Sequence, residues 1–166
     1  MYVSKNKIRS EGLSNPVNSL DDVLNWGDDC RMAHPISIHH VNFIVADLEV
    51  SIAEYQRRLG LGAFEIEDLS ARGVRTARIN LGGTWLVLVS PIRADSVPGR
   101  FLEMQGEGFF LLSFGVRDLE NALKFYEANG SLAPGAAIRN GVMDWRVIDL
   151  QTQEALGARF HLTEVN

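Results

Sequence analysis

The feature of this sequence that most constrains its fold is a pattern that occurs twice. Seven residues of the first half recur, with the same identity, at a constant spacing of 71 positions, as from Asp47 to Asp118. The first set is Phe43, Val45, Asp47, Leu48, Glu49, Tyr55 and Leu61, and the second is Phe114, Val116, Asp118, Leu119, Glu120, Tyr126 and Leu132. Chance matches would not hold one register over this length, so the pattern indicates an internal duplication.

Each copy is predicted to form a strand, a helix and three further strands. In the first copy an apolar strand leads into a helix that Asp47 opens and Gly60 ends, and Gly82-Gly83 predicts a tight hairpin. The strands expected there are 38–45, 63–69, 73–81 and 84–90. In the second copy we expect strands 109–116, 136–139, 142–150 and 158–164, with a helix over 118–129. The Gly- and Pro-containing segment 91–108 is predicted to be a loop between the copies.

These elements predict an α+β fold of two βαβββ modules. A sheet with one helix buries only one of its faces, so two such sheets side by side are expected to form an open, barrel-like sheet around one cleft, with the helices outside. We place this domain at 37–166, with modules at about 37–91 and 108–165. Residues 1–36 read as an N-terminal arm that packs on the domain or on a partner subunit, or else as a partly disordered tail.

Composition excludes several classes of function. The chain is 46% hydrophobic and 22% charged, as globular proteins are, and its longest apolar runs are too short to span a membrane. Its net charge of −5 argues against nucleic acid as a partner, because phosphate binding needs a basic face. The single cysteine, Cys30, cannot form an internal disulfide. We therefore expect a cytoplasmic protein that binds neither nucleic acid nor membrane.

The first strand supplies the first candidates for a functional site. Side chains alternate between the two faces of a strand, and Phe43 and Val45 belong to the face that packs on the helix. His40 and Asn42 are therefore predicted to face the cleft, and His39 to face away from it. A cleft between two modules is where a small-molecule ligand is expected.

Several stretches together resemble the vicinal oxygen chelate superfamily, within it the glyoxalase-like and methylmalonyl-CoA epimerase branch. They are 40–48, 59–62, 79–83, 88–91, 101–103, 106–108 and 114–119. The likeness covers roughly residues 36 to 164 and implies the cleft described above. It also implies a divalent metal held by one residue from each of four strands, which would chelate substrate oxygens and stabilise an enolate.

Carried over residue by residue, the four metal positions of this superfamily fall on His40, Val87, Leu111 and His161. Valine and leucine have no lone pair to donate, and stable sites usually have at least three protein ligands. We therefore expect no metal cofactor, with a divalent metal held by His40 and His161 as the alternative. Without a metal, the two histidines are predicted to act as an acid–base pair.

The other residues expected to contact a ligand come from neighbouring strands. Arg159 is predicted to bind a carboxylate or phosphate. The apolar side chains of Val87 and Leu111, at positions where the resemblance implies metal ligands, predict a more hydrophobic cleft. The full set of predicted ligand-binding residues is Asn42, Trp85, Val87, Phe109, Leu111 and Arg159.

Two hypotheses of different class follow. The first is an isomerase or lyase of the glyoxalase-like type, such as an epimerase, that acts on a small carbonyl or acyl-thioester compound. The second is a metal-free binding or resistance protein that sequesters an apolar or aromatic ligand. The resemblance also implies a homodimer, because paired modules of this superfamily often complete their clefts across a dimer.

Overall fold

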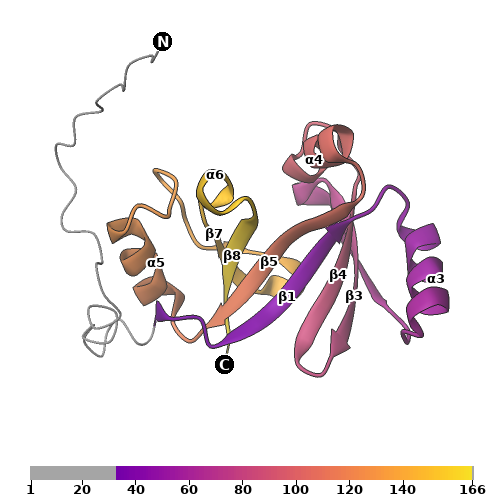
Figure 1. The fold of residues 1–166 in the computed structure, drawn as a ribbon, viewed down its shortest axis with the longest axis horizontal. Coiled ribbons are helices and arrows are strands. Elements are labelled where there is room, and N and C mark those ends of the chain that lie inside the picture. Colours follow the sequence, from indigo (N-terminus) through magenta and orange to yellow (C-terminus); the bar gives the residue numbers. More distant parts are fainter. Residues whose placement is uncertain (1–32, 166) are drawn as a thin grey trace, which may run out of the picture.

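The computed structural model describes residues 33–165, which form one curled sheet with helices on both faces (Figure 1). The strand order is β2-β3-β4-β1-β5-β8-β7-β6. The first module supplies β1 (Ser37–Ile44), β2 (Glu65–Leu69), β3 (Val74–Leu81) and β4 (Thr84–Pro91). The second supplies β5 (Gly108–Val116), β6 (Arg139–Asn140), β7 (Arg146–Asp149) and β8 (Arg159–Glu164). The predicted α+β fold of two βαβββ modules is confirmed.

The two modules meet at the centre of the sheet. β1 runs antiparallel to β5, and each of these strands pairs in parallel with the last strand of its own module, β1 with β4 and β5 with β8. The two modules therefore occupy equivalent places on either side of the β1–β5 ladder. Residues 71 positions apart, such as Phe43 and Phe114, lie at matching places in the two halves.

The two long helices begin in the same way. In α3 (Leu48–Leu59) the Asp47 carboxylate accepts a hydrogen bond from the Val50 N–H, and in α5 (Leu119–Ala128) Asp118 accepts from the Asn121 N–H. An aspartate at this position satisfies one of the unpaired N–H groups of the first turn. Each helix buries its first leucine on the outer face of its own module, and the two helices lie at opposite ends of the molecule (Figure 1).

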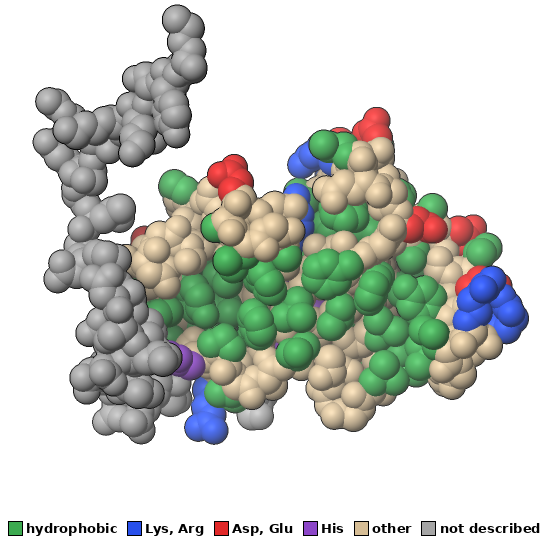
Figure 2. All heavy atoms as spheres, viewed as in Figure 1, with side chains coloured by type: hydrophobic (Ala, Val, Ile, Leu, Met, Phe, Trp, Pro, Cys, Tyr) green, Lys and Arg blue, Asp and Glu red, His purple; other side chains and the backbone are tan. Residues whose placement is uncertain are grey.

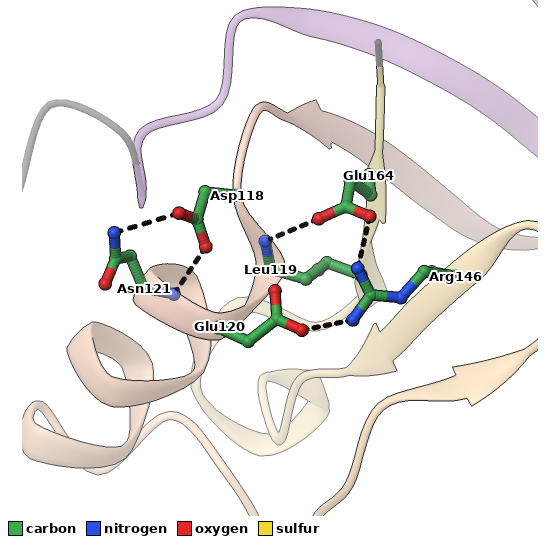
Figure 3. A network of polar contacts seen from close by, with 6 residues as sticks. All are labelled: Asp118, Leu119, Glu120, Asn121, Arg146 and Glu164. Atoms are coloured by element: carbon green, nitrogen blue, oxygen red, sulfur yellow. Dashed lines mark hydrogen bonds and ion pairs between the residues drawn. The ribbon is translucent and has the colours of Figure 1, made fainter.

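An ion pair between helix and sheet is also duplicated. Arg75 on β3 pairs with Glu49 of α3, and Arg146 on β7 pairs with Glu120 of α5 at the same spacing. In the second module Glu164 of β8 extends this network, because it accepts from Arg146 and from the Leu119 N–H (Figure 3). Glu164 is thus held at the start of α5.

The segment between the modules differs from the prediction. Residues 91–108 were expected to form a loop, but they contain the helix α4 (Val97–Gln105), which Ser96 caps by accepting from the Gly99 N–H. Pro98 is compatible with a helix because it lies in the first turn. A Cβ at Gly99 would stand 2.4 Å from the Arg93 carbonyl oxygen, so glycine here marks close packing and not a loop.

The last third of the chain is less regular than predicted. Of the expected strand 136–139 only the two-residue β6 forms, and the first part of 142–150 is the short 3-10 helix η2 (Val142–Asp144). A one-turn helix, α6 (Gln153–Leu156), precedes β8. A further 3-10 turn, η1 (Ser70–Arg72), links β2 to β3. These turns matter because η1, η2 and α6 all border the cavity described below.

Two bulges interrupt the central ladder. Ile38 pairs with Phe114 but His40 pairs with Ser113, which leaves His39 as an extra residue of β1. Asn42 pairs with Leu111 but Phe43 pairs with Phe109, which leaves Phe110 as an extra residue of β5. A bulge breaks the alternation of side chains and redirects the residues around it. The alternation of side chains is therefore interrupted at His39 and at Phe110.

The predicted arm at 1–36 lies mostly outside the described residues. Of its last four residues, Ala33 is fully buried in the cluster beneath α5. Figure 2 shows hydrophobic side chains gathered across the middle of the viewed face. Partly exposed apolar residues of the described chain include Ile36, Ile38 and Phe109. Within 33–165 no helix combines the length and the apolar character that a membrane crossing requires.

Candidate functional site

A cavity of about 840 Å³ lies on the face of the sheet opposite α3 and α5. Both modules line it: β3 contributes Val74 and Thr76, and β7 contributes Val147 and Asp149. Two further helices reach its rim, α4 with Val97 and Pro98 and α6 with Gln153 and Glu154. Both lie along the same edge of the sheet (Figure 1). The cavity is large enough for a small organic ligand.

Five of the predicted site residues line this cavity. They are His40 and Asn42 from β1, Leu111 from β5, and Arg159 and His161 from β8. β1 and β8 come from different modules, so the two histidines meet only because the sheet is continuous across the modules. Three residues predicted to contact a ligand, Trp85, Val87 and Phe109, are absent from the lining.

The structure gives a reason for each of these three. Val87 is fully buried in the hydrophobic cluster behind the cavity, and Trp85 packs on the same cluster. The bulge at Phe110 turns Phe109 to the outer face, where its ring lies 6.2 Å from that of Phe43. Phe110 takes the place in the cavity lining that Phe109 was expected to have.

The two cavity histidines are in direct contact. Nε2 of His40 lies 2.7 Å from Nε2 of His161, and both side chains are almost completely buried. The Trp145 ring stacks on His40 with centroids 5.0 Å apart. His39 was predicted to face away, but the bulge brings its Nδ1 to 2.8 Å from Nδ1 of His40 and its ring against Trp145. Three imidazoles therefore lie in series.

Burial keeps these imidazoles neutral. It lowers the pKa of His40 and of His161, and the neighbouring positive groups lower them further, although the Asp149 carboxylate opposes this for His161. Burial and the nearby His161 lower the pKa of His39 to about 4. A neutral imidazole can accept a proton, which an imidazolium cannot do.

Asp149 fixes the direction of the hydrogen bonds. Its Oδ1 lies 3.6 Å from Nδ1 of His161, and a carboxylate favours the tautomer that carries a proton on the facing nitrogen. His161 then accepts at Nε2 from the His40 Nε2–H, and His40 accepts at Nδ1 from the His39 Nδ1–H. Burial would raise the pKa of Asp149, but His161 and the ion pair with Arg139 outweigh it and lower the pKa.

Sequence reasoning missed two arginines of the cavity. Arg139 of β6 donates from Nε and Nη2 to the Asp149 carboxylate at 2.8 and 2.7 Å, and Arg72 of η1 enters from the other module. Arg72 ends a 3-10 turn and Arg139 lies in a two-residue strand, and both elements are too short for alternation to give the direction of a side chain. Arg78 of β3 pairs with Glu65 and Glu67 of β2 and does not line the cavity.

Unpartnered polar atoms concentrate at this cavity. Among the described residues, five buried side-chain nitrogen or oxygen atoms have no hydrogen-bond partner. Three of them, Asn42 Oδ1, Arg139 Nη1 and Arg159 Nε, belong to cavity-lining residues, and a fourth, His161 Nδ1, faces the Asp149 carboxylate at 3.6 Å, just beyond hydrogen-bond distance. Buried polar groups are nearly always satisfied in native proteins, so this concentration is typical of a site that binds a polar ligand.

The residues present do not fit the four-ligand metal site that the resemblance implies. Val87 and Leu111 offer only hydrocarbon, and Nε2 of His40 and Nε2 of His161 are engaged with each other. Within 33–165 no group of three or more His, Cys, Asp or Glu side chains is arranged to hold a metal ion. Glu164, another conceivable oxygen donor, is held at α5 by Arg146 and Leu119.

Comparisons with known proteins agree with this architecture. The family model of the glyoxalase/bleomycin resistance protein/dioxygenase superfamily matches residues 39–148. Human mitochondrial methylmalonyl-CoA epimerase is 35% identical over 71 residues, which are 43% of this chain and 40% of that protein. The matched part thus spans well under half of that curated relative.

Solved structures give longer matches. Methylmalonyl-CoA epimerase from Mycobacterium tuberculosis is 27% identical with a TM-score of 0.70, over 80% of this chain and 89% of the other. A variant of methylmalonyl-CoA epimerase from Streptomyces coelicolor in complex with 2-nitronate-propionyl-CoA is 28% identical with a TM-score of 0.72. That match covers 79% of this chain and 98% of the other.

Proposed function

Because the chain belongs to the glyoxalase/bleomycin resistance protein/dioxygenase superfamily, we propose that it is an epimerase-type isomerase. Its substrate would be a small acyl thioester with an acidic hydrogen on the carbon next to the carbonyl. His40 and His161 would transfer that proton. The observation that carries this proposal is the 2.7 Å contact between two buried imidazoles at the wall of a ligand-sized cavity.

The chemistry needs a base that is neutral before it reacts. In the proposed reaction the α-carbon–hydrogen bond breaks, its proton moves to an imidazole nitrogen, and the electron pair remains as an enolate. The other imidazole returns its N–H proton to the opposite face of that carbon, which gives the epimer, and the proton taken up by the first imidazole passes to it and restores the neutral pair. The hydrogen bond between His40 and His161 must open when the substrate binds, and Asp149 then stabilises the protonated His161.

The neighbouring residues also suit this role. Arg139 lies near enough to lower the pKa of both histidines, and the same positive charge would stabilise an enolate oxygen. The relatives of known structure supply the substrate class. They are methylmalonyl-CoA epimerases, and one of them holds the acyl-CoA analogue 2-nitronate-propionyl-CoA.

Proton exchange provides the direct test. We expect wild-type protein in D₂O to exchange the α-hydrogen of methylmalonyl-CoA for deuterium, as measured by NMR. The exchange should continue after the protein has been dialysed against EDTA. His40→Gln and His161→Gln should each slow the exchange by about 100-fold or more, the usual contribution of a general acid–base group. Glutamine keeps hydrogen-bonding capacity but moves no proton near neutral pH.

His34→Gln is the matched control, because His34 lies outside the cavity lining. It should exchange at the wild-type rate. Full activity in both cavity variants would exclude the histidine pair as the catalytic groups. Activity that is lost with EDTA and returns with a divalent cation would show that a metal acts here after all.

The second hypothesis, a metal-free binding protein, keeps one specific observation in its favour. The two histidines satisfy each other, and the positions where relatives of this superfamily place further metal ligands carry Val87 and Leu111. Tight binding of a CoA thioester without any α-hydrogen exchange would favour this function over the epimerase.

A further inference from the structure

The cavity holds arginine side chains that the described residues do not neutralise. Arg72 takes part in none of the hydrogen bonds and ion pairs found within 33–165, and its side chain reaches the cavity from an exposed turn. Burial and the nearby Arg139 lower its pKa, and Asp149 opposes them. Arg139 uses Nε and Nη2 on Asp149, while its buried Nη1 has no partner. A buried N–H without an acceptor is costly, and an anionic ligand group would offset that cost.

The two arginines approach each other from opposite modules. Arg72 ends η1, between β2 and β3, and its Nη1 would stand 3.7 Å from a Cβ placed on Gly141, two residues beyond Arg139. Arg139 Nη2 donates at 2.7 Å to Asp149 Oδ1, which lies 3.6 Å from Nδ1 of His161. A single carboxylate thus separates Arg139 from the histidine pair, and both arginines lower the pKa of His161.

The charge of the lining favours an anion. Arg72 and Arg139 carry two positive charges, and Asp149 balances one of them. Arg159 adds a third positive charge beside the Phe110 ring, and Glu154, the other acidic lining residue, is exposed on α6 at the rim. This excess of positive charge occurs in a chain whose net charge is −5. A carboxylate presents two oxygens to guanidinium donors.

We propose that Arg72 and Arg139 form a carboxylate-binding subsite beside His40 and His161, which fixes the ligand's acid group. The identification of the ligand as a thioester rests on the proposed function, whereas the binding of a carboxylate by the two arginines does not. Arg72 is the residue that determines specificity, because Arg139 is also needed to hold Asp149.

Paired ligands test the subsite by binding alone. Isothermal titration should show that the wild-type protein binds malonyl-CoA about tenfold or more tightly than acetyl-CoA, which lacks only the carboxylate. Arg72→Met should bring the two affinities within about twofold by weakening malonyl-CoA and leaving acetyl-CoA unchanged. Arg72→Lys keeps the charge without the planar pair of donors, and should retain part of the preference.

Arg58→Met is the matched control, because it removes the same charge from an exposed side chain of α3. It should keep the full preference for malonyl-CoA. Thermal unfolding of each variant shows whether it is folded, and a folded Arg72→Lys keeps the test decisive if Arg72→Met does not fold. Equal affinities of wild-type protein for malonyl-CoA and acetyl-CoA, together with malonate binding that Arg72→Met does not weaken, would overturn the proposal, as would an unchanged preference in a folded Arg72→Met.

Free malonate and inorganic phosphate identify the source of the anion. Malonate that binds wild-type protein but not Arg72→Met, without any preference between the CoA thioesters, would support the subsite and assign it to free dicarboxylates. Phosphate that binds more tightly than malonate would overturn the carboxylate assignment. None of these measurements depends on proton exchange, so failure of the epimerase proposal and failure of the subsite remain distinguishable.

Discussion

His40 and His161 occupy inequivalent places in a duplicated molecule. His40 lies 71 positions before Leu111, so these two residues are counterparts on β1 and β5. Val87 pairs with Asn42 on β1, and His161 pairs with Ser113 on β5. Asn42 and Ser113 are also 71 positions apart, so Val87 and His161 are counterparts on β4 and β8. Each set of counterparts thus holds one imidazole and one hydrocarbon side chain. The duplicated framework carries four positions with only two nitrogen donors.

This arrangement predicts that one substitution would strengthen metal binding. Leu111→His would add a third imidazole to the cavity next to His40, and three protein ligands are usual for zinc. We expect zinc affinity to rise at least about tenfold, measured by competition with a chromophoric chelator. Phe109→His, on the same strand but on the outer face, should leave zinc affinity unchanged. An equal rise in both variants would contradict this account.

At the level of single residues, the sequence predicted side chains on regular strands and missed those on turns. His40, Asn42 and His161 could be assigned to the cavity because strand alternation and the resemblance agree there. Arg72 lies in a 3-10 turn and Arg139 in a two-residue strand, where no periodicity tells the direction of a side chain. His39 does not line the cavity, as predicted, but its contact with His40 was not predicted because a bulge leaves no trace in the hydrophobic pattern.

The helices show the duplication most clearly among the elements. α3 and α5 each begin with an aspartate cap and are each tied to the sheet by a glutamate–arginine ion pair. In α5 the network of Figure 3 adds Glu164, so this helix is held to both β7 and β8. The start of α5 is therefore fixed by more groups than the start of α3.

Matched substitutions test whether the two caps are equivalent. Asp47→Ala and Asp118→Ala should each lower the free energy of unfolding by about 1 kcal/mol, as measured by urea denaturation, because each leaves an N–H of the first turn without its partner. Asp118→Ala should cost slightly more, since Asp118 also accepts from Asn121 Nδ2. A negligible effect of both would show that water replaces the caps.

The elements that could not be predicted share a physical cause. α4 contains Pro98 and Gly99 and is followed by Gly106 and Gly108, a composition that favours a loop. Tertiary packing overrides that preference, because Phe101 of α4 is buried against Phe110 with ring centroids 5.0 Å apart. The helices 48–59 and 119–128 were predictable because their caps and apolar spacing are local features.

For the molecule as a whole, the β1–β5 ladder is the contact that makes one body of two modules. Both modules place their first strand there, with β4 and β8 on either side. In amide hydrogen exchange we expect β1 and β5 to be the slowest strands and to open with similar free energies. The edge strands β2 and β6 should exchange much faster. Markedly different protection of β1 and β5 would show that the modules unfold separately.

The difference between the two halves of the cavity determines the direction in which a ligand can bind. A trough made of two identical halves would offer the same groups to either end of a molecule, which could then bind in two opposite directions. Here a half-turn about the central ladder would exchange His40 with Leu111 and His161 with Val87. The trough therefore has a defined polarity, and a bound molecule has a head and a tail. That sense of direction brings the same end of every bound molecule to the histidine pair, whichever of its two mirror-image forms is bound.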